Sequence, residues 1–217
     1  MFVSFEGLDG SGKTTQLDLL DARLRALGHA VTRVREPGGT ALGERVRGLL
    51  LDPAMEITPR AELLLFAAAR AHLCDTVIRP ALDRGDVVLA DRFFDSTTAY
   101  QSGGRGIVPV GDEPEGRRRK IPFRRTDFFN RFVTGGLAPD RTFLLRLDPD
   151  MALARRAGRA ADRMEAAGDA FYRRVAAAYD AIAAAHPERV RVLDAMTSPE
   201  AIHEAIWADL APSVAAG

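Results

Sequence analysis

Near the start of the chain lies a motif with a defined chemistry, the run Gly7-Leu8-Asp9-Gly10-Ser11-Gly12-Lys13-Thr14. It fits the pattern G-x-x-x-x-G-K-[ST], which binds the phosphates of nucleoside triphosphates. Glycines let successive backbone N–H groups turn toward phosphate oxygens, and the positive end of a following helix adds to that field. In this pattern Lys13 neutralises the β- and γ-phosphates, and Thr14 offers its hydroxyl to Mg²⁺.

A second group of charged residues follows an apolar segment. The run Asp86–Arg92 is apolar in its centre and ends in Asp91 and Arg92. A buried strand that ends in aspartate holds Mg²⁺ or its water shell in folds with such a phosphate-binding loop. Arg92 would lie beside the triphosphate, where its guanidinium can bind an acceptor phosphate with two hydrogen bonds.

An aromatic residue and an arginine share one face of a predicted long helix. Phe66 and Arg70 are four residues apart, which places them on neighbouring turns of the same face. The helix is expected to start at Thr58-Pro59, to kink near Pro80 and to stop at Gly85. The pair can stack on a base and bond to its edge; a core phenylalanine beside a solvated arginine is the alternative.

Arginines between two possible glycine hinges suggest a lid at about residues 155–168. They are Arg155, Arg156, Arg159 and Arg163, with hinges at Gly158 and Gly168. A closing lid would add positive charge near the transferred phosphoryl group and exclude water. A solvated helix face is the competing interpretation.

The elements around these residues predict one parallel α/β domain over residues 1–217. Strands are expected at Phe2–Phe5, Val31–Val34, Asp86–Arg92, Thr142–Leu147 and Val190–Leu193, with helices between them. This βαβ alternation predicts a five-stranded parallel sheet with helices on both faces. Arg146 is an unusual residue for a buried strand, so we expect it near the edge of the sheet or at one end of its strand.

Residues 107–126 form an atypical segment that is rich in proline, glycine and basic residues. The basic ones are Arg117, Arg118, Arg119, Lys120, Arg124 and Arg125, against three acidic ones, Asp112, Glu113 and Glu115, so the segment carries a charge of +3. Its composition predicts a surface loop. A loop without a function and a regulatory or partner-binding loop both remain open.

The charge, cysteine count and hydropathy of the whole chain argue against several classes of protein. The 217 residues hold 30 Lys+Arg and 30 Asp+Glu, so no net charge calls for a nucleic acid or an acidic membrane as partner. Cys74 is the single cysteine, which excludes an intrachain disulfide and favours a reducing cytoplasm. No apolar run reaches the roughly 20 residues that span a bilayer, and the first strand at Phe2 leaves no room for a leader peptide.

Taken together in their order, several runs resemble the thymidylate kinase family. These are Phe5–Thr15, Arg35-Glu36-Pro37-Gly38-Gly39-Thr40, Leu65–Arg70, Asp91-Arg92-Phe93 and Ser96–Gln101, and the resemblance covers nearly the whole chain. It implies a P-loop kinase fold with a helical lid, the transfer of the ATP γ-phosphate to dTMP to give dTDP with Mg²⁺, and a homodimer packed through helices. No covalent intermediate is expected.

The resemblance also implies a role for particular residues. Thymine would stack on Phe66, and Arg70, Thr97 and Gln101 would read its edge, while Tyr100 would crowd the 2′ position of the sugar. Asp9 would bond the 3′-hydroxyl, Arg92 would bind the dTMP phosphate, and the Glu36 loop would shape the acceptor site. Members without an arginine in the phosphate-binding loop carry it in the lid, so Arg159 and Arg163 are expected to act, ahead of Arg155 and Arg156.

Two other functions remain open at this stage. One is a kinase for another nucleoside monophosphate or a deoxynucleoside, which only the pocket of Phe66, Arg70, Thr97 and Gln101 would distinguish. The other is a nucleotide- or DNA-associated binding protein without catalysis, in which the basic loop is the working surface. Binding to DNA would weaken steeply with salt.

Overall fold

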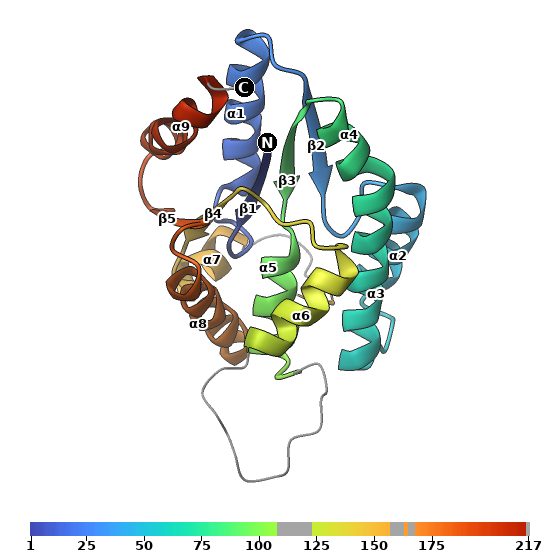
Figure 1. The fold of residues 1–217 in the computed structure, drawn as a ribbon. Helices are drawn as coiled ribbons and strands as arrows, with labels where there is room; N and C mark the ends of the chain where they lie inside the picture. The colour runs from blue at the N-terminus through green and yellow to red at the C-terminus, as the bar shows by residue number, and fades with distance from the viewer. Residues whose placement is uncertain (108–122, 157–162, 165–167, 216–217) are drawn as a thin grey trace.

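The five strands form one parallel sheet. The computed structural model describes residues 1–107, 123–156, 163–164 and 168–215. The strands are β1 (Phe2–Glu6), β2 (Val31–Arg35), β3 (Val87–Asp91), β4 (Arg141–Arg146) and β5 (Val190–Asp194), in the order β2-β3-β1-β4-β5. The predicted five-stranded parallel sheet is therefore confirmed (Figure 1).

The register brings the chemically important strand ends together. Phe5 of β1 is opposite Asp91 of β3, and Asp91 is opposite Arg35 of β2. Because parallel strands end at the same edge of the sheet, the segments that follow β1, β2 and β3 meet there. This edge is where open α/β sheets bind their ligands.

The helices connect and cover the strands. They are α1 (Lys13–Ala26), α2 (Ala41–Leu51), α3 (Pro59–Leu73), α4 (Arg79–Asp83), α5 (Phe94–Thr97), α6 (Phe123–Val133), α7 (Pro149–Arg156), α8 (Asp169–Ala185) and α9 (Pro199–Ala215). Two π-helical segments, η1 (Cys74–Ile78) and η2 (Thr98–Gly104), interrupt this series. Among the described residues, no helix is long and apolar enough to cross a membrane.

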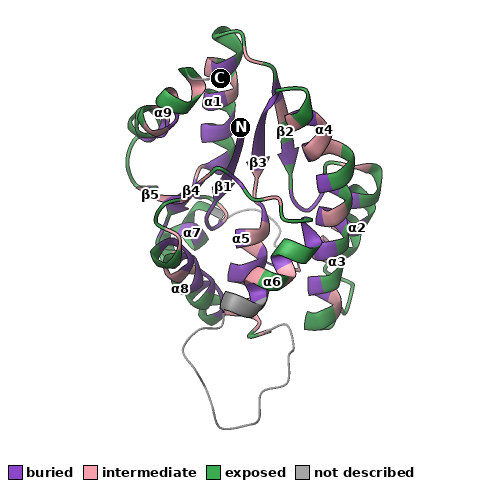
Figure 2. Ribbon diagram, in the orientation of Figure 1, coloured by how far each residue is buried: buried purple, intermediate pink, exposed green. Residues whose placement is uncertain are grey.

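Both faces of the sheet are buried under helices, as the purple inner strands in Figure 2 show. Alternate residues of β1 pack on opposite faces of the sheet, because successive side chains of a strand point in opposite directions. Val3 and Phe5 pack in a cluster with Leu17, Leu20 and Leu24 of α1 and with residues of α8 and α9. Phe2 packs with Cys74 and Ile78 of η1 on the other face.

The predicted long helix from Thr58 is divided into three parts. The π-helical η1 separates α3 from α4, and Pro80 lies in the first turn of α4. Proline has no N–H to donate, and its ring collides with the carbonyl group four residues earlier. The irregularity therefore lies in the turn before Pro80, and the helix ends before Gly85, which adopts φ +85°.

Other boundaries also differ from the sequence predictions. Tyr100 and Gln101 lie in the π-helical η2. Helix α6 begins at Phe123, so residues 123–126 of the segment predicted to be a surface loop are helical, while residues 108–122 lie outside the described residues. Arg146 is the exposed last residue of β4 and pairs with Asp180, which confirms its expected place at a strand end.

Candidate active site

The loop after β1 is shaped to receive an anion. Gly12 precedes α1 with φ +93°, and no side chain caps the helix N-terminus with a hydrogen bond. The first N–H groups of α1 are therefore open to a ligand. A Cβ atom at Gly7 would collide with the carbonyl oxygen of Leu145, so the sheet itself requires glycine at that position.

Lys13 lies inside this loop. Its Nζ donates hydrogen bonds to the carbonyl oxygens of Gly7 (3.2 Å) and Leu8 (2.9 Å) and lies 3.9 Å from Oδ1 of Asp9. Burial and the nearby charge of Arg92 lower the pKa of Lys13 to about 8. A phosphate group would supply the negative charge that this partly desolvated ammonium group lacks.

Oxygen ligands suitable for Mg²⁺ line the cavity beside Lys13. That cavity includes the hydroxyl of Thr14 and the carboxylate of Asp91, together with Gly10, Gly12 and Arg155. Mg²⁺ prefers a few hard oxygen ligands, its own waters and substrate phosphates. The two predicted metal ligands therefore fit the ion chemically, although the described residues hold no group of three or more acidic, histidine or cysteine side chains that could bind a metal without other ligands.

A second cavity joins the first. The structure places all eight predicted substrate-binding residues in its lining: Asp9, Glu36, Phe66, Arg70, Arg92, Thr97, Tyr100 and Gln101. Asp9, Glu36, Arg47 and Arg92 line both cavities. Arg92 therefore lies between the phosphate-binding loop and the second cavity. A residue that binds an acceptor phosphate would need this position.

Arg70 is held in the second cavity by a network of contacts. Its Nε donates to Oε2 of Glu36 (2.7 Å), its Nη1 to Oγ1 of Thr97 (2.7 Å) and its Nη2 to the carbonyl oxygen of Phe93 (3.3 Å). Burial raises the pKa of Glu36 despite the opposing charge of Arg70. Oε1 of Glu36 is buried and has no hydrogen-bond partner among the described residues, so it can accept a bond from a ligand.

A hydrogen bond fixes the orientation of Gln101, and ring contacts fix that of Tyr100. Nε2 of Gln101 donates to Oε1 of Glu62 at 3.0 Å. Tyr100 packs edge-on against the rings of Phe171, Tyr172 and Tyr179. Both side chains are therefore held rigidly where they meet the cavity.

The candidate lid arginines lie in three different situations. Arg159 falls outside the described residues. Arg163 donates to Oε2 of Glu62 (2.6 Å) and to the carbonyl oxygen of Leu50 (2.8 Å). Arg155, which the sequence ranked behind these two, donates to the carbonyl oxygen of Gly10 at 3.0 Å. Of Arg155 and Arg163, it is therefore Arg155 that contacts the phosphate-binding loop.

Sequence reasoning missed two residues of this site. Arg47 of α2 lines both cavities and donates to the carbonyl oxygen of Pro37; nothing in the sequence distinguishes it from the exposed Arg45 nearby. Glu62 accepts bonds from Gln101, Arg105 and Arg163. A signal for Glu62 did exist, because it precedes Phe66 by four residues and shares its helix face.

A phosphate-binding loop after the central strand and a second cavity that meets it at Arg92 define this protein as a P-loop kinase. A family model described as thymidylate kinase matches residues 5–110 and 116–206. The chain is 49% identical to the thymidylate kinase of Deinococcus radiodurans, over 96% of this chain and 95% of that protein. It is 48% identical to the thymidylate kinase of Bifidobacterium longum, over 97% of each.

A solved structure agrees with these relatives. The crystal structure of thymidylate kinase from Ehrlichia chaffeensis superposes with a TM-score of 0.73 and 34% sequence identity, over 97% of each chain. The chain belongs to the thymidylate kinase family.

Proposed function

We propose that this protein transfers the γ-phosphoryl group of ATP directly to dTMP, which gives dTDP. The observation that carries the proposal is the junction of the two cavities at Asp9 and Arg92. One cavity has the loop that binds triphosphates, and the other is lined by the residues implied to bind dTMP. Such an arrangement supports in-line transfer, in which catalysis comes from positioning and charge neutralisation.

The acceptor base would lie between Phe66 and the polar groups of α3, α5 and η2. Thymine stacks on Phe66, while Arg70, Thr97 and Gln101 face its edge. Tyr100 crowds the 2′ position and favours deoxyribose, and Asp9 bonds the 3′-hydroxyl. These roles rest on the family resemblance and are supported by the common cavity that all six residues line.

The phosphate groups would be held by three basic side chains. Lys13 binds the β- and γ-phosphates of ATP, Arg92 binds the dTMP phosphate, and Arg47 lies within reach of both cavities. Thr14 and Asp91 would hold Mg²⁺, directly or through water. When bound, this ion would neutralise charge on the phosphates and fix their geometry. A lid arginine, Arg155, Arg159 or Arg163, would complete the charge around the transferred group.

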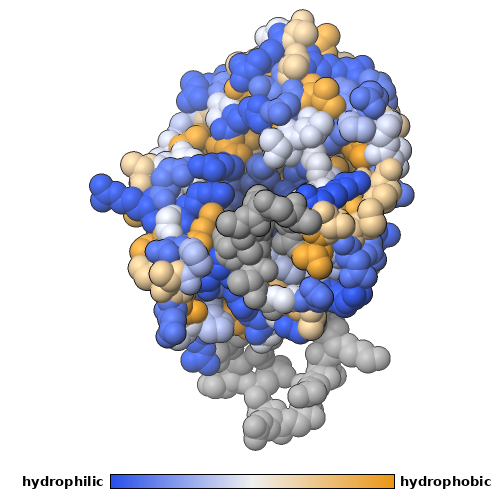
Figure 3. All heavy atoms as spheres, turned by 180° about the vertical axis from the view of Figure 1, so that it is seen from behind, coloured by the Kyte–Doolittle hydropathy of each residue, from blue (hydrophilic) through white to orange (hydrophobic). Residues whose placement is uncertain are grey.

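We propose a homodimer that packs through α3 and α6, the helices that lie side by side at the front of Figure 1. Phe128 and Phe132 of α6 are 75% and 79% exposed, and Leu64 of α3 is 60% exposed. Large apolar groups in this state mark interaction sites when they gather on one face. The opposite face of the molecule is mainly hydrophilic, with scattered apolar groups (Figure 3).

The decisive experiment is an acceptor panel. ADP release from ATP and Mg²⁺ would be measured with dTMP, dUMP, dCMP, dGMP, AMP and thymidine in separate reactions. Strong turnover with dTMP and little with the others is expected. Turnover with another acceptor would keep the phosphoryl transfer but overturn the roles of Phe66, Arg70, Thr97 and Gln101. No turnover with any acceptor would favour a nucleotide-binding protein without catalysis.

A further inference from the structure

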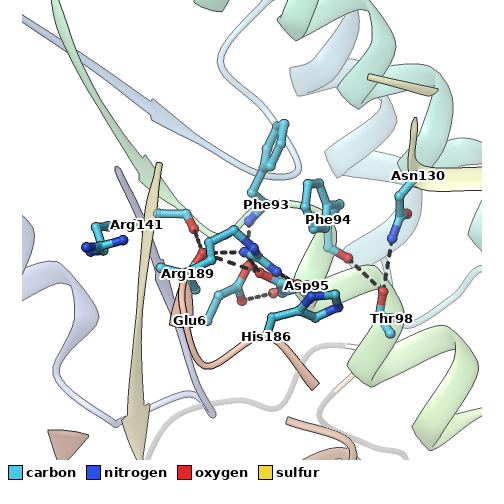
Figure 4. Close-up of polar contacts among 12 residues, drawn as sticks. Glu6, Phe93, Phe94, Asp95, Thr98, Asn130, Arg141, His186 and Arg189 are labelled. Atoms are coloured by element: carbon cyan, nitrogen blue, oxygen red, sulfur yellow. Dashed lines mark hydrogen bonds and ion pairs between the residues drawn. The ribbon is translucent and has the colours of Figure 1, made fainter. Parts of the chain in front are cut away.

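Glu6 is a buried acidic residue to which the roles above assign no function. It is the last residue of β1, directly before the phosphate-binding loop, and its exposed fraction is 0%. Its Oε1 accepts hydrogen bonds from the backbone N–H groups of Phe93 (2.8 Å) and Ser96 (3.3 Å). Figure 4 shows Glu6 beneath Phe93 and beside Asp95 and Arg189. The carboxylate is therefore fixed in orientation by the segment that follows β3.

The other carboxylate oxygen contacts two hydroxyl groups. Oε2 of Glu6 accepts hydrogen bonds from Oγ of Ser96 (2.6 Å) and from the hydroxyl of Tyr179 (2.8 Å). These two hydroxyl oxygens are themselves 2.9 Å apart. The ionised form of Glu6 has no hydrogen to give, so in that form the hydroxyl hydrogens point to Glu6 or to each other, and lone pairs remain on the opposite side.

Those lone pairs face the arginine between the two cavities. Nη1 of Arg92 donates to Oγ of Ser96 at 3.1 Å and to the hydroxyl of Tyr179 at 3.2 Å. Its Nη2 donates to Oδ1 of Asp9 at 2.7 Å. The guanidinium group is thus fixed at both nitrogen ends, by Asp9 at one and by two hydroxyls at the other.

The electrostatics of Glu6 also link it to Arg92, because burial and the nearby Asp95 raise the pKa of Glu6 to about 7 and the charge of Arg92 opposes this rise. The neighbouring carboxylate of Asp95 is paired with Arg189 by bonds of 2.6 and 2.9 Å. Glu6 forms no direct ion pair within the described part of the chain, and its bonds with side chains run to the two hydroxyls that contact Arg92. Buried polar networks of this kind hold a functional group rigidly when every member is satisfied.

We propose that Glu6 is a positioning residue, which holds the guanidinium group of Arg92 for the acceptor phosphate through the hydroxyls of Ser96 and Tyr179. The proposal rests on the proposed role of Arg92 in binding dTMP. Replacement by glutamine would place an N–H donor against the two hydroxyls. They would turn, and at least one of their bonds to Arg92 would be lost.

The test is a double-mutant cycle of Glu6→Gln and Arg92→Ala, in which KM for dTMP, KM for ATP and kcat are measured. Glu6→Gln should raise KM for dTMP roughly tenfold, the scale of a lost supporting contact, while KM for ATP changes little. In the Arg92→Ala background, Glu6→Gln should have no further effect on KM for dTMP. An equal rise in KM for dTMP in the wild-type and Arg92→Ala backgrounds would show that Glu6 does not act through Arg92.

A second pair of variants keeps the test decisive if Glu6→Gln does not fold. Tyr179 lies outside the lining of both cavities, so Tyr179→Phe removes one bridging hydroxyl without touching substrate. It should raise KM for dTMP, whereas Asp180→Asn should not, because Asp180 follows Tyr179 in α8 and forms an exposed ion pair with Arg146. A lower melting temperature with an unchanged KM would make the role purely structural. If Arg92→Ala alone leaves the KM for dTMP unchanged, Arg92 does not bind the acceptor phosphate, and Glu6 cannot act through it.

Discussion

Oδ1 of Asp9 lies 2.7 Å from Nη2 of Arg92 and 3.9 Å from Nζ of Lys13. A carboxylate within an anion-binding loop is unfavourable unless a cation balances it, and two cations do so here. The carboxylate of Asp9 thus reduces the repulsion between the charges of Lys13 and Arg92 when no phosphate is bound.

Asp9→Asn should therefore weaken the acceptor side of the reaction. The variant keeps a group that can bond a sugar hydroxyl but releases Nη2 of Arg92 from its ion pair. We expect kcat/KM for dTMP to fall about tenfold or more, equivalent to roughly 1.4 kcal/mol, with KM for ATP unchanged or lower. Asp150→Asn, in an exposed ion pair with Arg173, is the matched control. A larger change in the KM for ATP than in the KM for dTMP would contradict the role of Asp9 on the acceptor side.

Lys13→Met should remove turnover without unfolding the protein. Loss of one charge-stabilising group commonly costs roughly 10² to 10³ in kcat. Because folding lowers the pKa of Lys13 to about 8, the folded state disfavours its charged form at pH 7. The melting temperature of the variant without ligand should therefore be equal to or above that of the wild type, which differential scanning calorimetry would measure. Substantial remaining turnover would exclude Lys13 from phosphoryl transfer.

Arg70 should affect stability as well as acceptor binding. Its guanidinium group is 1% exposed and pairs with the buried Glu36, so Arg70→Met leaves a buried carboxylate without its cation. Breaking such a pair costs roughly 3–5 kcal/mol in the free energy of unfolding, which urea denaturation would measure. Adding Glu36→Gln should recover part of the stability but not the KM for dTMP. A double variant as unstable as Arg70→Met would show that the pair is not the cause.

Phe132→Glu should give a monomer if α6 lies in the dimer interface. A charge placed in an apolar interface is costly to bury. The molar mass from light scattering after gel filtration should then halve relative to the wild type. Leu27→Glu, at a 56% exposed residue after α1, should leave the mass unchanged. A monomeric wild type, or a dimeric Phe132→Glu, would contradict the proposed interface.

Cys74 should report unfolding. Its side chain is fully buried in η1, and burial raises the pKa of the thiol to about 12. Only the thiolate reacts with disulfide reagents, so the folded protein should not react at pH 8, whereas one thiol should react in denaturing urea. Fast reaction of the folded protein would mean that η1 opens locally.

Much of the fold followed from local sequence patterns. Apolar runs predicted the five strands, and the pair Thr58-Pro59 predicted the start of the long helix. These patterns are informative because a sheet buried on both faces demands nearly continuous apolar strands. The glycine-rich loop could likewise be placed, since its backbone geometry depends on residues next to one another in the chain.

The contacts within the site were decided only by the tertiary structure. Arg47 comes from a helix whose sequence does not reveal which face meets a cavity, and η2 departs from regular helical spacing. The link from Glu6 through Tyr179 to Arg92 joins residues from β1, α8 and the end of β3. Sequence spacing determines which side chains share one element, but partners far apart in the chain meet only after the sheet has assembled.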